Sequence, residues 1–167
     1  GQPRPAGMGR VGMGLDPDVL DDALGLGASK GAGETTTSVH RVQGGQGARA
    51  GQVSQERVVV DSAGDATIQG QGQLNVSLGD RSHAVYYRDT RRPGGEIVSF
   101  EIPTWLSDFI KEEAIPQFRY GANPRNQRGM APKIVDPSTP GYSVELPQPW
   151  VDWVREYAVP GSGRKTP

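Results

Sequence analysis

The segment Glu96–Pro103 (EIVSFEIP) constrains the fold most, because it predicts a strand with two unlike faces. Every second residue on one side is apolar, namely Val98, Phe100 and Ile102. The other side carries Ile97, Ser99 and Glu101. Such a strand packs one face on a core and leaves the other to polar groups. Glu101 therefore has a rigid support that suits a catalytic carboxylate as well as a plain solvent-facing one.

Further alternating and helical patterns surround this strand. Strands are predicted at residues 35–43, 55–62, 66–69, 73–78 and 142–146, with a short edge strand at 133–136. Helices are predicted at residues 81–91 and 104–114, and near the C-terminus, where Pro149 suits a first turn. The proline-rich segment 116–141 is long for a plain connection, which indicates a functional or partner-contacting loop. Together these patterns predict an α+β fold.

The distribution of glycine sets the expected domain limits. The 167-residue chain contains 24 glycines and 14 prolines, and its hydrophobic fraction is only 34%. Thirteen of those glycines lie within residues 1–51. Residues 1–36 are therefore expected to be a flexible Gly/Pro-rich leader, with at most a short helix at 16–24. Residues 37–159 are expected to fold, and residues 160–167 to form a disordered tail.

Several classes of function are disfavoured by composition. A net charge of −1 gives no overall electrostatic footprint for nucleic acid. The absence of cysteine excludes disulfides, thiolate nucleophiles and cysteine-ligated metals. No group of His, Asp and Glu has metal-ligand spacing, so no metal site is predicted. There is neither a membrane-length apolar run nor a signal-peptide pattern. The first residue is Gly1, which we interpret as the start of a fragment or of a processed product.

Polar side chains interrupt three of the predicted strands, namely Arg41 beside His40, the pair Asn75 and Ser77, and Ser99 with Glu101. If these strands share a sheet, the polar groups are expected to converge on one cleft. An arginine holds a diphosphate through two parallel hydrogen bonds. A carboxylate stabilises the positive charge that develops at an anomeric carbon during glycosidic cleavage. The combination favours cleavage of a glycosidic bond in a phosphate-bearing nucleotide.

Four short motifs carry a resemblance to a known family: HRVQGG at 40–45, RVVVD at 57–61, LNVSLG at 74–79 and IVSFEIP at 97–103. Over residues 38–158 the chain resembles the C-terminal toxin domains of bacterial polymorphic toxins, and more narrowly those with an ADP-ribosyltransferase fold. The resemblance implies a split arrangement of short, mostly antiparallel strands with flanking helices. It also implies an NAD-dependent mono-ADP-ribosyltransferase that modifies a macromolecular target.

The resemblance also implies a set of site residues. Glu101, Arg41 and Ser77 would be catalytic, and the NAD-binding residues would be Arg41, Val42, Asn75, Ser77 and Ser99. Arg41 would hold the NAD phosphates, while Ser77 with Asn75 would shape the nicotinamide pocket. NAD would be the substrate, with no metal. Asn75-Val76-Ser77 stands in place of the familiar Ser-Thr-Ser triplet, and Ser99 in place of the Glu or Gln often found two residues before the catalytic Glu. Arginine is therefore not the expected acceptor.

The resemblance further implies a biological setting. The protein would be a secreted or delivered effector that acts in the cytoplasm of the target cell, without inserting into the membrane. Its partners would be a macromolecular acceptor (protein or RNA), an upstream carrier protein and a cognate immunity protein.

Two alternatives belong to other classes. A metal-independent ribonuclease toxin would use His40 and His83 as base and acid. A non-catalytic interaction module delivered with a carrier would instead show no toxicity and no dependence on any of these residues.

Overall fold

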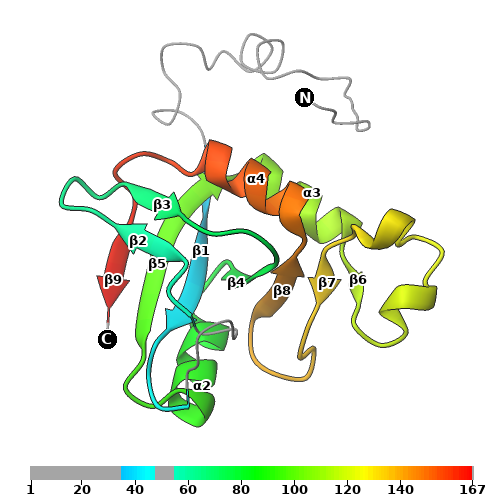
Figure 1. Ribbon diagram of the computed structural model, residues 1–167, viewed down its shortest axis with the longest axis horizontal. Helices are drawn as coiled ribbons and strands as arrows, with labels where there is room; N and C mark the ends of the chain where they lie inside the picture. The colour runs from blue at the N-terminus through cyan, green and yellow to red at the C-terminus, as the bar shows by residue number, and fades with distance from the viewer. Residues whose placement is uncertain (1–34, 48–54, 167) are drawn as a thin grey trace, which may run out of the picture. The chain divides into compact units, whose positions relative to one another are not determined.

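The structure is a computed structural model that describes residues 35–47 and 55–166. The expected leader up to residue 34, including its helix at 16–24, lies outside this range. Thr36–Pro167 forms one compact unit. Its described part combines a seven-stranded, mostly antiparallel sheet, a two-stranded sheet and three helices. The predicted α+β class is confirmed in this general form (Figure 1).

The large sheet has the strand order β6-β7-β8-β4-β1-β5-β9 within the described residues. Its central strands are β8 (Tyr142–Leu146), β4 (Leu74–Leu78), β1 (Thr36–Gln43) and β5 (Glu96–Pro103). The outer strands are β6 (Ile115–Pro116), β7 (Lys133–Ile134) and β9 (Arg164–Thr166). Only the β6–β7 pairing in this sheet is parallel. The predicted central strands are confirmed to within one residue, whereas the edge strand predicted at 133–136 is shorter.

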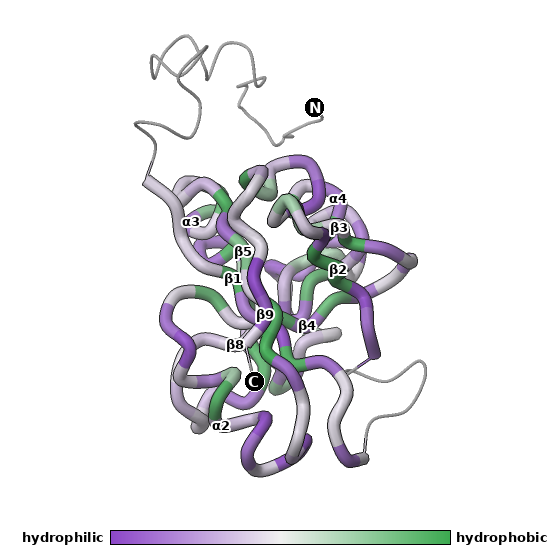
Figure 2. The backbone as a smooth tube through the Cα atoms, turned by 90° about the vertical axis from the view of Figure 1, so that its left-hand side faces the viewer, coloured by the Kyte–Doolittle hydropathy of each residue, from purple (hydrophilic) through white to green (hydrophobic). Residues whose placement is uncertain are grey.

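One face of this sheet, which we call the core face, carries the hydrophobic core. It receives the apolar alternation of the central strands, and its innermost side chains include Val39, Phe100, Ile102 and Val144. The small sheet, β2 (Val58–Val60) with β3 (Ala66–Ile68), adds Val58 and Ile68 to the same core. Hydrophobic stretches of β2 and β3 stand out in Figure 2. The face opposite, which carries Ser99 and Glu101, is called the polar face below.

Two helices complete the core. The helices α3 (Thr104–Glu113) and α4 (Gln148–Tyr157) lie side by side in Figure 1. Their inward residues are fully buried, namely Leu106, Ile110, Val151 and Val154. The aromatic rings of Phe109, Trp150 and Trp153 join the helices, with centroids 5.1–5.6 Å apart. Within the described part of the chain, no helix is both long and apolar enough to cross a membrane.

The third helix, α2 (Ser82–Arg91), covers one end of the polar face. Its Ala84 packs with Val42 of β1 and Ile97 of β5 in a small cluster apart from the main core. Val42 and Ile97 are the apolar residues that β1 and β5 place on the polar face. The helix thus seals that end of the face and leaves the polar groups beyond it to form a site.

The C-terminal segment differs from its prediction. Residues 160–167 were expected to be disordered, but Arg164–Thr166 form β9 on the free edge of β5. The backbone N–H of Gly163 donates to the Gly64 carbonyl at 2.7 Å, and the Gly161 N–H donates to the Asp65 carboxylate at 2.8 Å. The prediction was wrong because composition does not reveal that an unpaired strand edge is available for backbone hydrogen bonds.

Residues 117–131 form an excursion between β6 and β7. It contains two short 3-10 turns, η1 (Tyr120–Ala122) and η2 (Gln127–Gly129). The ribbon in Figure 1 shows this segment at the right-hand side, next to β6 and β7. It belongs to the proline-rich segment 116–141, which was expected to be a functional or partner-contacting loop.

Candidate functional site

A row of polar residues crosses the polar face from one strand to the next. In register across β8, β4, β1, β5 and β9 lie Ser143, Ser77, His40, Ser99 and Arg164. We call this set the polar row. Neighbouring members are adjacent because antiparallel partners stand directly opposite each other on one face. The sheet therefore brings together several polar groups that are separated by up to 124 positions in sequence.

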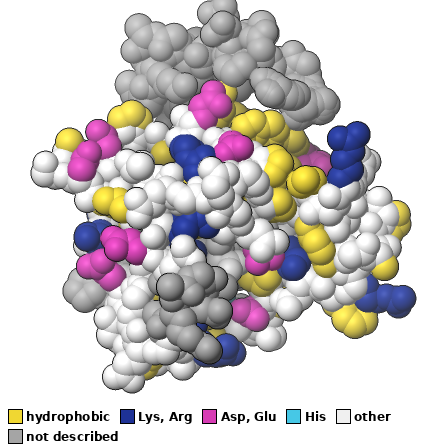
Figure 3. All heavy atoms as spheres, viewed as in Figure 1, with side chains coloured by type: hydrophobic (Ala, Val, Ile, Leu, Met, Phe, Trp, Pro, Cys, Tyr) yellow, Lys and Arg dark blue, Asp and Glu magenta, His cyan; other side chains and the backbone are white. Residues whose placement is uncertain are grey.

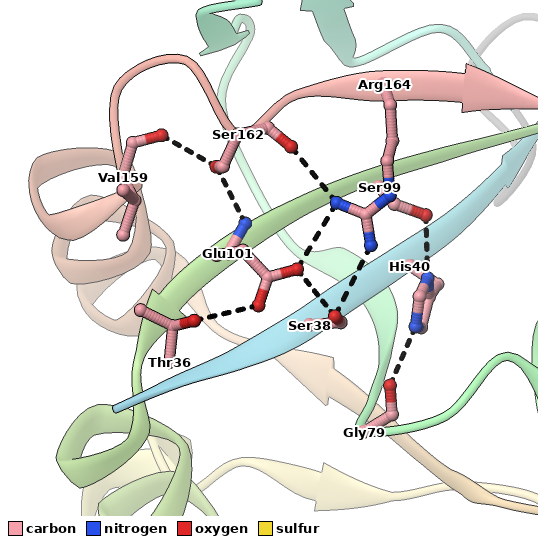
Figure 4. Close-up of polar contacts among 9 residues, drawn as sticks. All are labelled: Thr36, Ser38, His40, Gly79, Ser99, Glu101, Val159, Ser162 and Arg164. Atoms are coloured by element: carbon pink, nitrogen blue, oxygen red, sulfur yellow. Dashed lines mark hydrogen bonds and ion pairs between the residues drawn. The ribbon is translucent and has the colours of Figure 1, made fainter. Parts of the chain in front are cut away.

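Glu101 lies two residues along β5 from the polar row, opposite Ser38 of β1. Its carboxylate accepts hydrogen bonds from the Ser38 hydroxyl at 2.6 Å and the Thr36 hydroxyl at 3.1 Å. The Arg164 guanidinium forms an ion pair with it, with a nitrogen–oxygen distance of 3.2 Å. Figure 4 shows these three donors around the carboxylate, whose side chain remains 21% exposed. The carboxylate is thus held in one orientation by donors from two strands, β1 and β9.

The backbone of Glu101 is fixed as well. Its N–H donates to the Ser162 hydroxyl oxygen at 2.9 Å, and its carbonyl accepts from the Val159 N–H at 2.9 Å. The Ser162 hydroxyl in turn donates to the Val159 carbonyl at 2.7 Å. The segment after α4 therefore holds the backbone of Glu101, which no pattern in the sequence had indicated.

His40 is buried in the middle of the polar row. Its Nε2 lies 2.8 Å from the Gly79 carbonyl, which can only accept, so Nε2 carries the proton. In the neutral ring Nδ1 then accepts from the Ser99 hydroxyl, which lies 2.6 Å away (Figure 4). Burial lowers the pKa of His40, and the positive charge of Arg164 acts in the same direction. His40 is therefore expected to be neutral near pH 7.

A cavity of about 400 Å³ adjoins His40 on the polar face. Its floor is formed by Asn75, Ser77 and Ser143, and α2 contributes His83 and Tyr87 to its wall. On the β7–β8 side it is bordered by Lys133 and Glu145, whose side chains form an ion pair at 3.1 Å. Amide, hydroxyl, imidazole and charged groups thus surround a space large enough for part of a nucleotide.

Two groups on the cavity floor have unused hydrogen-bonding capacity. The Ser77 hydroxyl is buried and has no hydrogen-bond partner within the described residues. The Asn75 amide likewise makes no side-chain hydrogen bond to any described residue. Buried polar groups normally have partners, so an unpartnered hydroxyl that borders a cavity points to a ligand or a water there.

His83, the second histidine, borders the same cavity as His40. The Thr139 hydroxyl donates to the Asp136 carbonyl, so it accepts from His83 Nδ1 at 3.0 Å. Burial lowers the pKa of His83 too. The ring also stacks against Tyr87, with centroids 6.2 Å apart.

Arg41 does not converge with the other predicted site residues. Arg41 borders the cavity. Its guanidinium nevertheless lies on the core face, because Arg41 follows His40 in β1 and stands opposite Val98 of β5. There it donates to the Asn75 carbonyl at 2.9 Å, the Gln55 carbonyl at 2.7 Å and the Gln43 amide oxygen at 3.1 Å. Burial, with help from the charge of Arg57, lowers the pKa of Arg41 to about 10.

The expected single cleft is therefore only partly formed. Ser77, Asn75 and Val42 border the cavity, whereas Ser99 and Glu101 lie farther along the polar face. Sequence reasoning missed Ser38 and Arg164, which hold Glu101. Ser38 could have been found from strand alternation once the pairing of β1 with β5 was known. Arg164 could not, because its segment carries no strand signal.

Among the described residues, no group of three or more His, Asp or Glu side chains is arranged to hold a metal ion. No protein-family model, curated protein or solved structure matched this chain.

Proposed function

We propose that this domain transfers ADP-ribose from NAD to a macromolecular target, with Glu101 as the catalytic carboxylate. The observation that carries the proposal is the fixation of the Glu101 side chain by Thr36, Ser38 and Arg164 on a polar strand face. A carboxylate held in this way needs little reorganisation when charge develops next to it. The cavity on the same face provides room for part of the nucleotide.

The reaction breaks the N-glycosidic bond between nicotinamide and the ribose. Nicotinamide leaves with the bonding electrons, and positive charge develops at the anomeric carbon and ring oxygen. An oxygen or nitrogen of the acceptor then bonds to the anomeric carbon and gives up its proton to solvent or to a nearby base. In this scheme the Glu101 carboxylate stabilises the positive charge in the transition state, an effect worth about 10²- to 10³-fold in rate.

In this proposal the NAD phosphates are bound by a cation on the polar face and not by Arg41, the residue predicted from the sequence. Arg164 is the guanidinium paired with Glu101, and its side chain is 46% exposed. Its planar fork suits a diphosphate. A diphosphate would share this guanidinium with Glu101, whose carboxylate is also held by the Thr36 and Ser38 hydroxyls. Asn75 and Ser77 supply the unpartnered amide and hydroxyl for the uncharged part of the substrate.

The biological role is part of the same proposal. The domain acts as the toxic part of a delivered effector, in the cytoplasm of a target cell. Its acceptor is a macromolecule, its carrier lies upstream, and a cognate immunity protein protects the producing cell. These statements rest on the resemblance of the four motifs.

The test compares Glu101→Gln with Glu96→Gln in the full chain. Glu96 lies on the same strand, is exposed, and pairs with Lys165 at 3.7 Å, so it is a matched control. We expect Glu101→Gln to lower nicotinamide release from NAD, and labelling of macromolecules by labelled NAD in bacteria, by at least about 100-fold. Glu96→Gln should retain both. Full activity of the Glu101→Gln protein would refute the assignment.

A second candidate function is metal-independent cleavage of RNA. It is favoured by the presence of His40 and His83 at one cavity, together with Lys133. It ranks second because both nitrogens of His40 already have hydrogen-bond partners. This function predicts that the protein degrades RNA without NAD and that His83→Ala abolishes the degradation, whereas Glu101→Gln does not.

A further inference from the structure

Basic residues gather in the excursion between β6 and β7. Residues 117–131 contain Arg119, Arg125 and Arg128 but neither Asp nor Glu, and Lys133 follows in β7, in a chain whose net charge is −1. Lys133 is neutralised by Glu145, and Arg125 donates to the Glu112 carbonyl at 2.8 Å. The side chains of Arg119 and Arg128 form no hydrogen bond or ion pair with any described residue. The excursion therefore presents positive charge that the described part of the domain does not compensate.

The excursion also exposes apolar side chains. Phe118 is 79% exposed and Met130 is 46% exposed, and both are among the large hydrophobic residues that the described part of the chain leaves in solvent. Figure 3 shows dark-blue and yellow side chains together at the right-hand edge, where Figure 1 places this segment. Phenylalanine, methionine and arginine together are typical of the centre of protein interfaces, where lysine and acidic residues are depleted.

This exposure is built into an ordered loop. The Tyr120 hydroxyl donates to the Ala131 carbonyl at 2.5 Å, and the Asn126 amide links the Tyr120 carbonyl to the Ala131 N–H. The Trp150 indole of α4 donates to the Met130 carbonyl at 2.9 Å. These contacts tie the excursion to itself and to the helical layer. An exposed Phe118 on such a support loses little conformational freedom on binding, which favours affinity.

Backbone conformation adds a further indication. Arg119 and Arg128 adopt positive φ values of 56° and 58°, a left-handed conformation that is uncommon for residues other than glycine, asparagine and aspartate. Within the excursion, the two arginines whose side chains lack partners are thus also the two that adopt this unfavourable backbone conformation. Glycine or asparagine would adopt this conformation at a lower cost, and other residues held in it are found mainly at functional sites.

We propose that residues 117–131 form a docking surface for an acidic protein, with Phe118 as the apolar anchor and Arg119 and Arg128 as the charged contacts. The partner offers carboxylates around an apolar pocket. Protein is favoured over nucleic acid because the chain as a whole is not basic, with a net charge of −1, and because the non-aromatic Met130 is exposed together with Phe118. This inference is independent of the enzymatic activity proposed above.

The test uses the full chain and a fluorescently labelled amphipathic peptide of Glu and Leu as the probe. We expect saturable binding in fluorescence anisotropy that weakens as salt is added. Phe118→Ala should weaken it about tenfold, which corresponds to about 1.4 kcal/mol. The double variant Arg119→Asn with Arg128→Asn should weaken it as much, and it keeps residues that tolerate positive φ. The matched control, Arg88→Asn on α2, should bind as the unmodified chain does.

Thermal melts monitored by circular dichroism check that each variant is folded. The inference is overturned if the Glu/Leu peptide does not bind, or if it binds the Phe118→Ala protein equally well. It is also overturned if single-stranded RNA or vesicles containing phosphatidylglycerol bind in a Phe118-dependent manner while the peptide does not.

Discussion

The Arg41 guanidinium donates hydrogen bonds to three oxygens on the core face, where it is 4% exposed. Truncating it removes the guanidinium donor from the Asn75 and Gln55 carbonyls, whereas the Gln43 amide oxygen keeps the Arg57 and Val58 N–H groups as donors. We expect Arg41→Ala to lower the free energy of unfolding by about 3 kcal/mol, measured by urea denaturation at neutral pH. Arg88→Ala on α2, which removes an ion pair with the 61% exposed Asp89, should cost less than about 1 kcal/mol.

The same variant decides between two roles for this arginine. A structural role predicts that activity falls only as far as the folded population falls. An Arg41→Ala protein that is as stable as the unmodified chain but has lost NAD turnover would restore the phosphate-binding role that the sequence implied.

His40 links stability to pH. Burial is the main cause that lowers its pKa from 6.5; Arg164 and Arg81 lower it further, whereas the Gly79 carbonyl and Glu101 raise it. The folded protein therefore takes up this proton at a lower pH than the unfolded chain does. The contribution of the neutral ring is fully present above about pH 6.5 and is lost as the pH falls below that value toward the folded-state pKa.

We therefore expect the urea midpoint to fall between about pH 7.5 and pH 5, and to fall less in His40→Gln than in the unmodified chain. His83 has a pKa lowered by burial as well, so the His40→Gln protein should keep part of the slope. Equal slopes in both proteins would mean that the ring of His40 does not titrate with folding.

At the scale of elements, β5 and β1 show what sequence could and could not provide. The alternation in β5 correctly separated Phe100 from Glu101. In β1 the pattern was ambiguous, because Val39 and Val42 fall on opposite faces and both are buried. Only pairing with β5 determines that His40, and not Arg41, joins the polar face. Strand alternation alone therefore predicted the part of the candidate site on β5, Ser99 with Glu101, but not the part on β1, His40.

The edge strand β9 covers β5 beside Glu101, so its removal has a local consequence. A chain ending at Gly163 keeps Ser162, which binds the Glu101 backbone, but loses the pairing of residues 164–166 with 97–99. We expect hydrogen exchange of the β5 amides that face β9 to accelerate at least about tenfold. Amides of β4, in the middle of the sheet, are the internal control. Unchanged exchange in β5 would mean that β9 is not formed in solution.

At the scale of the whole molecule, the two proposed functional surfaces lie on different parts of one scaffold within the described residues. The helices α3 and α4 and the small sheet cover the core face of the large sheet, so the polar face of the same sheet is free for a site. The excursion lies between β6 and β7 at one edge of the large sheet, and β9 forms the opposite edge. Chemistry at Glu101 and docking at Phe118 can therefore be disrupted separately, and Phe118→Ala should leave nicotinamide release from NAD unchanged.

The compact unit begins at Thr36, where β1 starts, and contains its own core. β1 pairs along its whole length with β5, from Thr36 opposite Pro103 to Gln43 opposite Glu96. We therefore expect residues 36–167 expressed alone to melt within about 3 °C of the full chain, as measured by calorimetry. A chain that begins at Gly44 lacks the central strand and should not fold. A melting temperature for residues 36–167 lower by about 8 °C or more would show that preceding residues contribute to the core.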